Sequence, residues 1–315
     1  MNVAKIDRNN VALFLDYCKR VRGEVDDSYL SDEDLSAFEP ERGRPSYVLL
    51  QAGVPVGAAS FVEDDYLAAA GKARLRIFRA DDGRPESYAA LWEAIEPSIE
   101  GVPYAFLFAK EEDARVRRAM ESLAFAQERI AYALLRDGDP PIGEPVVPDG
   151  YELRRFRYGR DEAAWCDVRN AAFATLRGSE APMAPEHVAK WERGEDELEG
   201  GMLLLFAGDE PVGCVRSHKD DYEGVPCATI GPLAVKPAFQ GRGLGRTLLR
   251  AAVRNAAERG FPRTLLSVNA ENEGAVALYL QEGFRKTLAF VCYSRVFPEQ
   301  PHRSTRFADN SQTMD

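Results

Sequence analysis

Two spacings of apolar residues recur along the chain. Apolar positions three to four residues apart predict amphipathic helices, and short apolar runs bounded by turn residues predict strands. We expect helices at residues 10–22, 87–99, 113–123, 160–174, 244–259 and 273–282. We expect strands at residues 47–51, 56–62, 74–79, 104–109, 125–136, 202–207, 212–217, 228–235, 264–268 and 284–297. This order indicates an α/β fold with early hairpins and one βαβ crossover near the end of each series.

The same series of elements occurs twice. Pro55-Val56-Gly57 and Asp64-Asp65-Tyr66 recur 156 residues later as Pro211-Val212-Gly213 and Asp220-Asp221-Tyr222. Gly101, Leu107 and Phe125 match Gly260, Leu266 and Phe284 at an offset of 159. We therefore expect two α/β domains, 1–137 and 151–297, each with a mixed central sheet flanked by helices. Residues 138–150, rich in proline and glycine, read as an extended linker, and the polar residues 298–315 read as a disordered tail.

Composition excludes several classes of protein. Of 315 residues, 40 are Lys or Arg and 51 are Asp or Glu, so a net charge of −11 disfavours a nucleic-acid role. The longest apolar runs, 104–109 and 202–207, are too short to span a membrane. The first residues lack the apolar core of a signal peptide. Five scattered cysteines and three histidines predict reduced thiols in a cytoplasmic protein, without a structural metal.

The stretch with the clearest chemistry is residues 230–245. An apolar strand runs into Gln240-Gly241-Arg242-Gly243-Leu244-Gly245, and a helix follows. Glycines let backbone N–H groups approach an anion, and the start of the helix adds a positive dipole. Arg242 and Arg246 add full charges, so the loop suits a pyrophosphate. Arg246 breaks the dinucleotide pattern G-x-G-x-x-G, and the nucleotide-binding P-loop pattern is absent.

Two motifs carry a family resemblance. Gln240-x-x-Gly243-x-Gly245 resembles the Q/R-x-x-G-x-G/A signature of the GNAT family of N-acetyltransferases. Asn272-x-x-Ala275-x-x-Leu278-Tyr279, followed by Gly283-Phe284, resembles a second block of that family. The resemblance implies that acetyl-CoA is the cosubstrate and that no metal is needed. It also implies that residues 240–246 hold the pyrophosphate. The tandem layout resembles that of mycothiol synthases and related tandem acetyltransferases.

The resemblance also implies roles for single residues. Leu233, Ala234 and Val235 would offer backbone N–H groups to the acetyl group and pantetheine, Asn272 would hold the pantetheine arm, and Tyr279 would protonate the departing thiolate. The implied reaction is direct transfer of acetyl to a primary amine of a small molecule; a non-catalytic acyl-CoA sensor or scaffold is the alternative. The alternatives are that Asn272 is a helix cap, instead of or in addition to this role, and that Tyr279 is a core aromatic.

The base that deprotonates the amine stays open. His218, Asp220, Asp221, Tyr222 and Glu223 are candidates, expected on the turn before residues 228–235, and a chain of waters would also serve. The acidic run at residues 195–199 is expected to be solvated surface.

The first copy departs from both motifs. Residues 81–86, DDGRPE, stand where the second copy has residues 240–245. Three carboxylates would repel a diphosphate, and Pro85 has no N–H group to donate. Asp113 and Met120 replace Asn272 and Tyr279. We expect this copy to have lost acetyl-CoA binding, and to pack on the second copy and shape its acceptor cleft.

Overall fold

The computed structural model of the protein describes residues 1–179 and 181–297, so the tail expected at 298–315 lies outside the described residues. The N-terminal half contains β1 (Asn2–Lys5), α1 (Val11–Val21), η1 (Arg22–Glu24), α2 (Asp32–Ser36), β2 (Tyr47–Gln51), β3 (Val54–Phe61), α3 (Asp65–Ala69), β4 (Lys72–Ala80), α4 (Pro85–Ile95), η2 (Glu96–Ile99), β5 (Tyr104–Lys110), α5 (Ala114–Ser122) and β6 (Ala126–Arg136).

The C-terminal half follows the same order of main helices and strands, except that β9 leads into β10 with no counterpart of α3 between them. It contains β7 (Tyr151–Arg155), α6 (Glu162–Phe173), α7 (Pro185–Ala189), η3 (Lys190–Arg193), β8 (Glu197–Ala207), β9 (Glu210–Tyr222), β10 (Val225–Val235), η4 (Pro237–Phe239), α8 (Leu244–Glu258), β11 (Thr264–Asn269), α9 (Glu273–Gln281) and β12 (Arg285–Val296). The helices and strands predicted from the sequence are confirmed. The short elements β1, α2, α3, β7 and α7 were not predicted.

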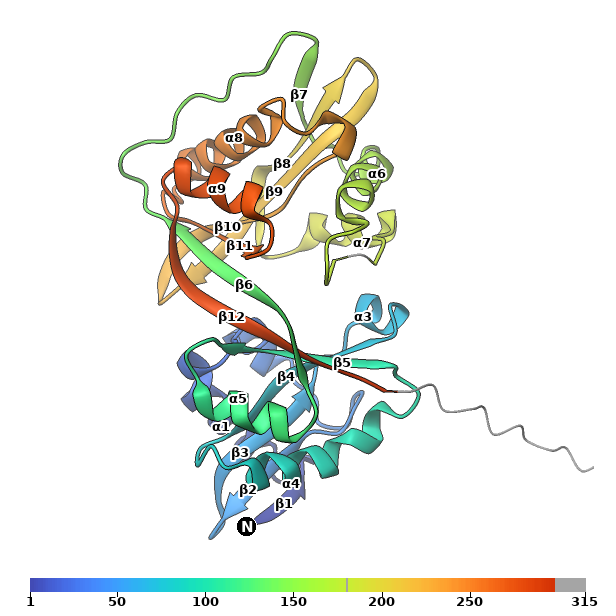
Figure 1. The fold of residues 1–315 in the computed structure, drawn as a ribbon, viewed down its shortest axis with the longest axis vertical. Coiled ribbons are helices and arrows are strands. Elements are labelled where there is room, and N and C mark those ends of the chain that lie inside the picture. The colour runs from blue at the N-terminus through green and yellow to red at the C-terminus, as the bar shows by residue number, and fades with distance from the viewer. Residues whose placement is uncertain (180, 298–315) are drawn as a thin grey trace, which may run out of the picture.

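All the strands join in one sheet of twelve, in the order β1-β2-β3-β4-β5-β12-β6-β11-β10-β9-β8-β7. The last strand of each half is exchanged. β12 lies between β5 and β6, so Phe290 stands opposite Lys110 on one side and Ala131 on the other. β6 in turn pairs with β11 of the C-terminal half. Figure 1 shows β6 and β12 running together from one half into the other. Neither half therefore completes its sheet without a strand from the other.

Helices cover both faces of the sheet in each half. In the C-terminal half, α8 and α9 close one core with Leu205, Leu248 and Leu266, and α6 closes another with Trp165 and Leu204. The linker is extended along α8, where the Thr247 hydroxyl donates to the carbonyl of Val146 at 2.5 Å. In the described part of the chain, none of the helices has the length and apolar character that crossing a bilayer requires.

Candidate active site

The glycine-rich loop leads from β10 into α8. Gly243 is the N-cap of α8 with a φ of +80°, and Gly241 has a φ of +76°. A side chain with a Cβ is strained in this left-handed region, which accounts for the two glycines. A Cβ added at either position would meet no atom within 4 Å, so the loop faces open space. Because the first N–H groups of a helix lack helical partners, this loop has the features of an anion-binding site.

Two polar side chains of the loop have protein partners. Gln240 donates from Nε2 to the carbonyl of Val235 at 3.0 Å, which ties the loop to the end of β10. Arg242 donates to the Tyr151 hydroxyl and to the Ala238 carbonyl, both at 3.0 Å. Arg242 pairs with no carboxylate of the described residues, so its charge is available to a ligand.

Arg246, the other predicted cation, is already paired. Its Nε lies 2.9 Å from Oε1 of Glu282, and its Nη2 donates to Gln281 at 2.5 Å. Glu282 also accepts two hydrogen bonds from Arg250. The net positive charge beside the loop is therefore smaller than the sequence alone predicts, and the open backbone with Arg242 supplies most of the attraction for an anion.

Next to the loop, β10 and β11 separate. Their parallel pairing runs from Ala228 opposite Thr264 to Ile230 opposite Leu266. β10 continues to Val235 and β11 to Asn269 without further pairing between them. A bulge between Ile230 and Leu233 in the β9–β10 ladder marks the point of separation.

The gap exposes backbone donors of β10. Lys236 donates its N–H to the Val212 carbonyl of β9 at 2.9 Å. N–H groups point alternately to the two sides of a strand, so those of Leu233 and Val235 point away from β9 and into the gap. The N–H of Ala234 points to β9. Of the three residues predicted to offer N–H groups, two therefore have the required direction.

The residues of the second motif lie on the α8 side of this gap. A Cβ at Gly245 would lie 3.6 Å from Leu278 of α9 and 4.0 Å from Leu233 of β10, so loop, helix and strand converge there. Asn272 caps α9 by accepting the N–H of Ala275 at 3.2 Å. The structure therefore shows Asn272 as a helix cap, whereas its contact with the pantetheine arm stays a prediction.

Tyr279 combines a packed ring with a hydroxyl that has no hydrogen-bond partner among the described residues. The residue is 7% exposed and its ring meets Phe284 edge-on at 5.9 Å between centroids. Burial raises its pKa to about 12. No described side chain or carbonyl takes a hydrogen bond from this hydroxyl. The group is therefore protonated at neutral pH and has a proton that a ligand could accept.

The sequence predicted that the candidate bases lie on a turn, but most of them do not. β9 extends to Tyr222, so His218, Asp220 and Asp221 are strand residues and only Glu223 lies in the turn, with a φ of +56°. The prediction was wrong because pairing with β10 continues through polar residues, which sequence patterns favour as loops. The acidic run is also partly strand, since β8 begins at Glu197.

Of these candidates, His218 lies nearest the separating strands. It stands opposite Thr229 of β10, one residue before the pairing with β11 ends. Ala228 and Ile230 pack toward α8, so Thr229 and His218 face the other side of the sheet. Burial lowers the pKa of His218 to about 4, with Arg216 adding to the shift, so its imidazole is neutral near pH 7. Its buried Nδ1 has no described partner.

Ser267, which lies on the same face, was not among the predicted site residues. Leu266 and Val268 of β11 point into the core beneath α8 and α9, so Ser267 between them points to the opposite face. It is exposed, although β11 lies in the middle of the twelve-stranded sheet. A single serine in an apolar strand was the available signal. An amine could reach the gap between β10 and β11 from this side.

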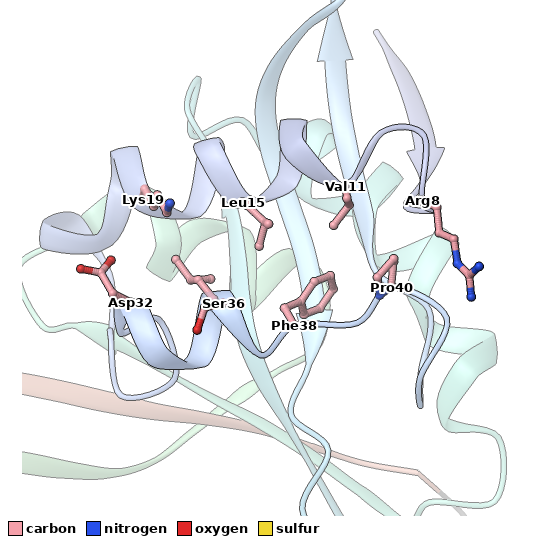
Figure 2. A pocket seen from close by; sticks show the side chains of 9 residues that line it. Arg8, Val11, Leu15, Lys19, Asp32, Ser36, Phe38 and Pro40 are labelled. Carbon is pink, nitrogen blue, oxygen red and sulfur yellow. The ribbon is translucent and has the colours of Figure 1, made fainter. Parts of the chain in front are cut away.

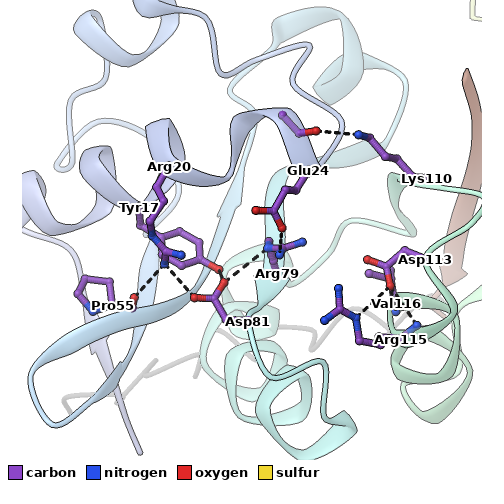
Figure 3. Close-up of polar contacts among 11 residues, drawn as sticks. Tyr17, Arg20, Glu24, Pro55, Arg79, Asp81, Lys110, Asp113, Arg115 and Val116 are labelled. Carbon is purple, nitrogen blue, oxygen red and sulfur yellow. Dashed lines mark hydrogen bonds and ion pairs between the residues drawn. The ribbon is translucent and has the colours of Figure 1, made fainter. Parts of the chain in front are cut away.

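The N-terminal half fills the corresponding positions with its own side chains. Asp82 takes hydrogen bonds from the Arg84 N–H at 3.0 Å and the Ser87 hydroxyl at 2.8 Å, at the start of α4. Burial opposes its charged form, but these hydrogen bonds outweigh burial and hold its pKa below the usual value. Asp81, next to it, accepts from Tyr17 at 3.0 Å and Arg20 at 2.9 Å (Figure 3). A carboxylate thus stands where the C-terminal half has open backbone.

The gap between β4 and β5 is also filled. Glu24 pairs with Arg79 of β4, and Lys110 of β5 donates to the Gly23 carbonyl at 2.7 Å (Figure 3). Asp26 pairs with Arg74 at 2.6 Å. The remaining cavity between these strands is about 30 Å³, room for about two waters.

A larger cavity, of about 360 Å³, lies elsewhere in the N-terminal half. It lies between α1 and α2 and is lined by Val11, Leu15 and Phe38, with Arg8 and Lys19 at its edge (Figure 2). None of the predicted site residues lines it. This cavity therefore contributes nothing to the candidate active site.

The five cysteines are free and buried, and burial raises the pKa of Cys227 to about 12. Within residues 1–179 and 181–297, no three His, Cys, Asp or Glu side chains gather as a metal ion would require.

Comparison with known proteins identifies the class of protein to which this fold and this site point. Residues 165–284 match the model of the acetyltransferase (GNAT) family. The C-terminal half of the chain therefore contains a GNAT acetyltransferase domain. The whole chain has the fold of tandem GNAT proteins. It is similar in structure to a tandem GNAT protein from the clavulanic acid biosynthesis pathway, with a TM-score of 0.65 and 16% sequence identity. The match covers 95% of this chain and 99% of that chain.

A GCN5-related N-acetyltransferase from Sphaerobacter thermophilus matches with a TM-score of 0.72 at 18% identity, over 94% of this chain and 95% of that one. In sequence, the chain is 34% identical to the mycothiol acetyltransferase of Streptomyces scabiei over 169 residues, 51% of this chain and 50% of the relative. It spans about half the length of that relative. It is 29% identical to the mycothiol acetyltransferase of Streptomyces avermitilis over 284 residues, 87% of each chain.

Proposed function

We propose that the protein is an acetyl-CoA-dependent N-acetyltransferase that acetylates a primary amine of a small molecule. The observation that carries the proposal is the open loop at Gly241 and Gly243, directly beside the gap between β10 and β11. A pyrophosphate on this loop would place the attached pantetheine arm along the free N–H groups of β10. Domain boundaries near residues 137 and 151 are part of the proposal.

The chemistry follows from the groups around the gap. A neutral amine attacks the thioester carbonyl, a C–N bond forms and the C–S bond breaks. The N–H groups of Leu233 and Val235 stabilise the oxyanion of the tetrahedral intermediate. Tyr279 gives its proton to the departing thiolate. The amine loses a proton to a base on the opposite face, and His218 is the candidate there, because its imidazole is neutral and its Nδ1 has no partner among the described residues.

The names of the relatives give the first acceptor to test. Mycothiol acetyltransferases cover most of this chain in two comparisons. The cysteinyl amine of the pseudo-disaccharide precursor of mycothiol is therefore the leading probe, with an aminoglycoside and free amino acids beside it. A net charge of −11 favours cationic amines generally.

The deciding experiment incubates the whole chain with acetyl-CoA and each amine, and measures CoA and acetylated amine by chromatography. Chromatography is needed because the leading probe carries a thiol of its own. We expect equimolar CoA and acetylated product with at least one amine. Acetyl-CoA binding without transfer to any amine of the panel would support the sensor or scaffold instead.

A further inference from the structure

The N-terminal half contacts the described part of the segment between α6 and α7 (residues 174–179 and 181–184), which we call the α6–α7 connection. Tyr66 of α3 donates its hydroxyl to the Ala181 carbonyl at 2.6 Å. The Tyr66 ring also meets His187 of α7 edge-on, at 5.9 Å between centroids. Figure 1 shows α3 reaching from the N-terminal half toward α6 and α7. One residue of the first half thus contacts both the connection and the helix after it.

Tyr66 also completes the partners of a buried cation. Arg169 of α6 is 6% exposed and forms no ion pair with a described carboxylate. It donates to the Ala181 carbonyl at 2.6 Å and to the Tyr66 hydroxyl at 3.3 Å. A buried guanidinium without a counterion depends on neutral acceptors, so loss of one of them is costly. Tyr66, Arg169 and Ala181 therefore form one hydrogen-bonded unit across the two halves.

The start of the connection is held by β6. Arg177 donates to the Glu128 carbonyl at 3.0 Å, and Gly178 lies so close to Arg129 that a Cβ there would be 2.3 Å from its guanidinium carbon. Asn269, the last residue of β11, donates to the Arg177 carbonyl at 3.0 Å. Asn269 lies beyond the point where β10 and β11 separate. The connection therefore reaches the open gap on the face opposite α8.

This placement gives the N-terminal half a role. The loop and α9 approach the gap from one face, so the amine must reach it from the other, where the connection lies. We propose that Tyr66 is a positioning residue: it fixes the α6–α7 connection and thereby sets the affinity for the amine. This inference rests on the proposed function for its kinetic part, and the positional part can be measured without turnover.

The test replaces Tyr66 by Phe in the whole chain, which keeps the ring and removes the hydroxyl. We expect KM for the amine to rise about three- to tenfold, the range for losing one hydrogen bond, while KM for acetyl-CoA stays within about twofold. Hydrogen exchange without substrates should speed up in peptides spanning residues 174–184 and stay unchanged in residues 240–245. The probe is the amine that the wild-type chain acetylates in the panel above.

Tyr47→Phe is the matched control, because Tyr47 is a half-buried tyrosine of the same half whose hydroxyl has no described partner. It should change neither KM nor exchange. The inference is overturned if Y66F leaves exchange in residues 174–184 unchanged, or loosens them without raising KM for the amine. If the wild type acetylates no amine, the proposed function fails, and the exchange result still decides whether Tyr66 fixes the connection.

Discussion

The two halves of the chain build the same frame and differ in what stands inside it. α8 begins after its N-cap Gly243 and α4 after its N-cap Arg84; α9 begins after Asn272 and α5 after Asp113. Within each pair, the two N-cap positions differ by 159 residues, so the helices that border the gap begin at equivalent positions in the two halves. The loss expected for the first half therefore lies in side chains and not in the course of the backbone.

The side chains at the gap show how such a loss can come about. Ser267 corresponds to Phe108, which lies between the guanidinium groups of Arg74 and Arg129, each 5.2 Å from its ring centroid. Arg74 is the counterpart of Thr229, because Arg74 stands opposite Phe106 of β5 and Thr229 stands opposite Leu265 of β11. Small side chains leave the C-terminal gap accessible, whereas large and charged ones fill the N-terminal gap. Sharing a fold is thus weak evidence for sharing a site.

The largest effect should come from Gly243→Glu. A glutamate there is strained at a φ of +80° and places a negative charge where the pyrophosphate should bind. We expect affinity for acetyl-CoA to fall by about a hundredfold or more. Isothermal titration measures it, and the wild type should bind one equivalent.

Arg84→Glu is the matched change in the other half and should leave acetyl-CoA affinity unaltered. A second equivalent in the wild type, or loss of binding in R84E, would break the comparison. The titration needs the whole chain. A fragment of the first half lacks β12, which pairs with both β5 and β6, and would leave a gap in its own sheet.

The next largest effect concerns Tyr279→Phe. The phenylalanine keeps the packing against Phe284 but has no proton to give. We expect kcat to fall about 10²- to 10⁴-fold with little change in acetyl-CoA affinity. Because burial raises the pKa of Tyr279 to about 12, the wild-type rate should show no basic decline from this group below about pH 11.

Met120 occupies the matching position and is fully buried. Met120→Leu conserves volume and should change neither kcat nor affinity. Steady-state kinetics on both variants makes the test. A Y279F enzyme with wild-type kcat would leave Tyr279 as a core aromatic only.

Local patterns predicted much of this molecule because much of it is locally encoded. The glycine loop and the helix cap at Asn272 are each encoded within a few consecutive residues. The exchanged strands are different, because the hydrophobic pattern predicted strands at 125–136 and 284–297 but not which strands they pair with. The contact between Tyr66 and Ala181 joins residues 115 positions apart, and no spacing rule indicates such a pair.

The smallest effect tests whether one carboxylate alone closes the first site. Asp82→Ala removes the acceptor for the Arg84 N–H and the Ser87 hydroxyl, so the free energy of unfolding should fall by about 1 kcal/mol, as for loss of a helix cap. Its folded pKa is depressed, so this stabilisation is present at neutral pH and is lost as pH falls below the usual value of 3.8. Urea unfolding of the wild type and of D82A at pH 7 and pH 3 measures the loss of stability and its pH dependence.

Glu86→Ala removes an exposed carboxylate in the first turn of the same helix and controls for the loss of charge alone. Acetyl-CoA stoichiometry should stay at one, because Pro85 still lacks an N–H and Arg74 still fills the gap; a second equivalent in D82A would show that Asp82 by itself separates the two halves.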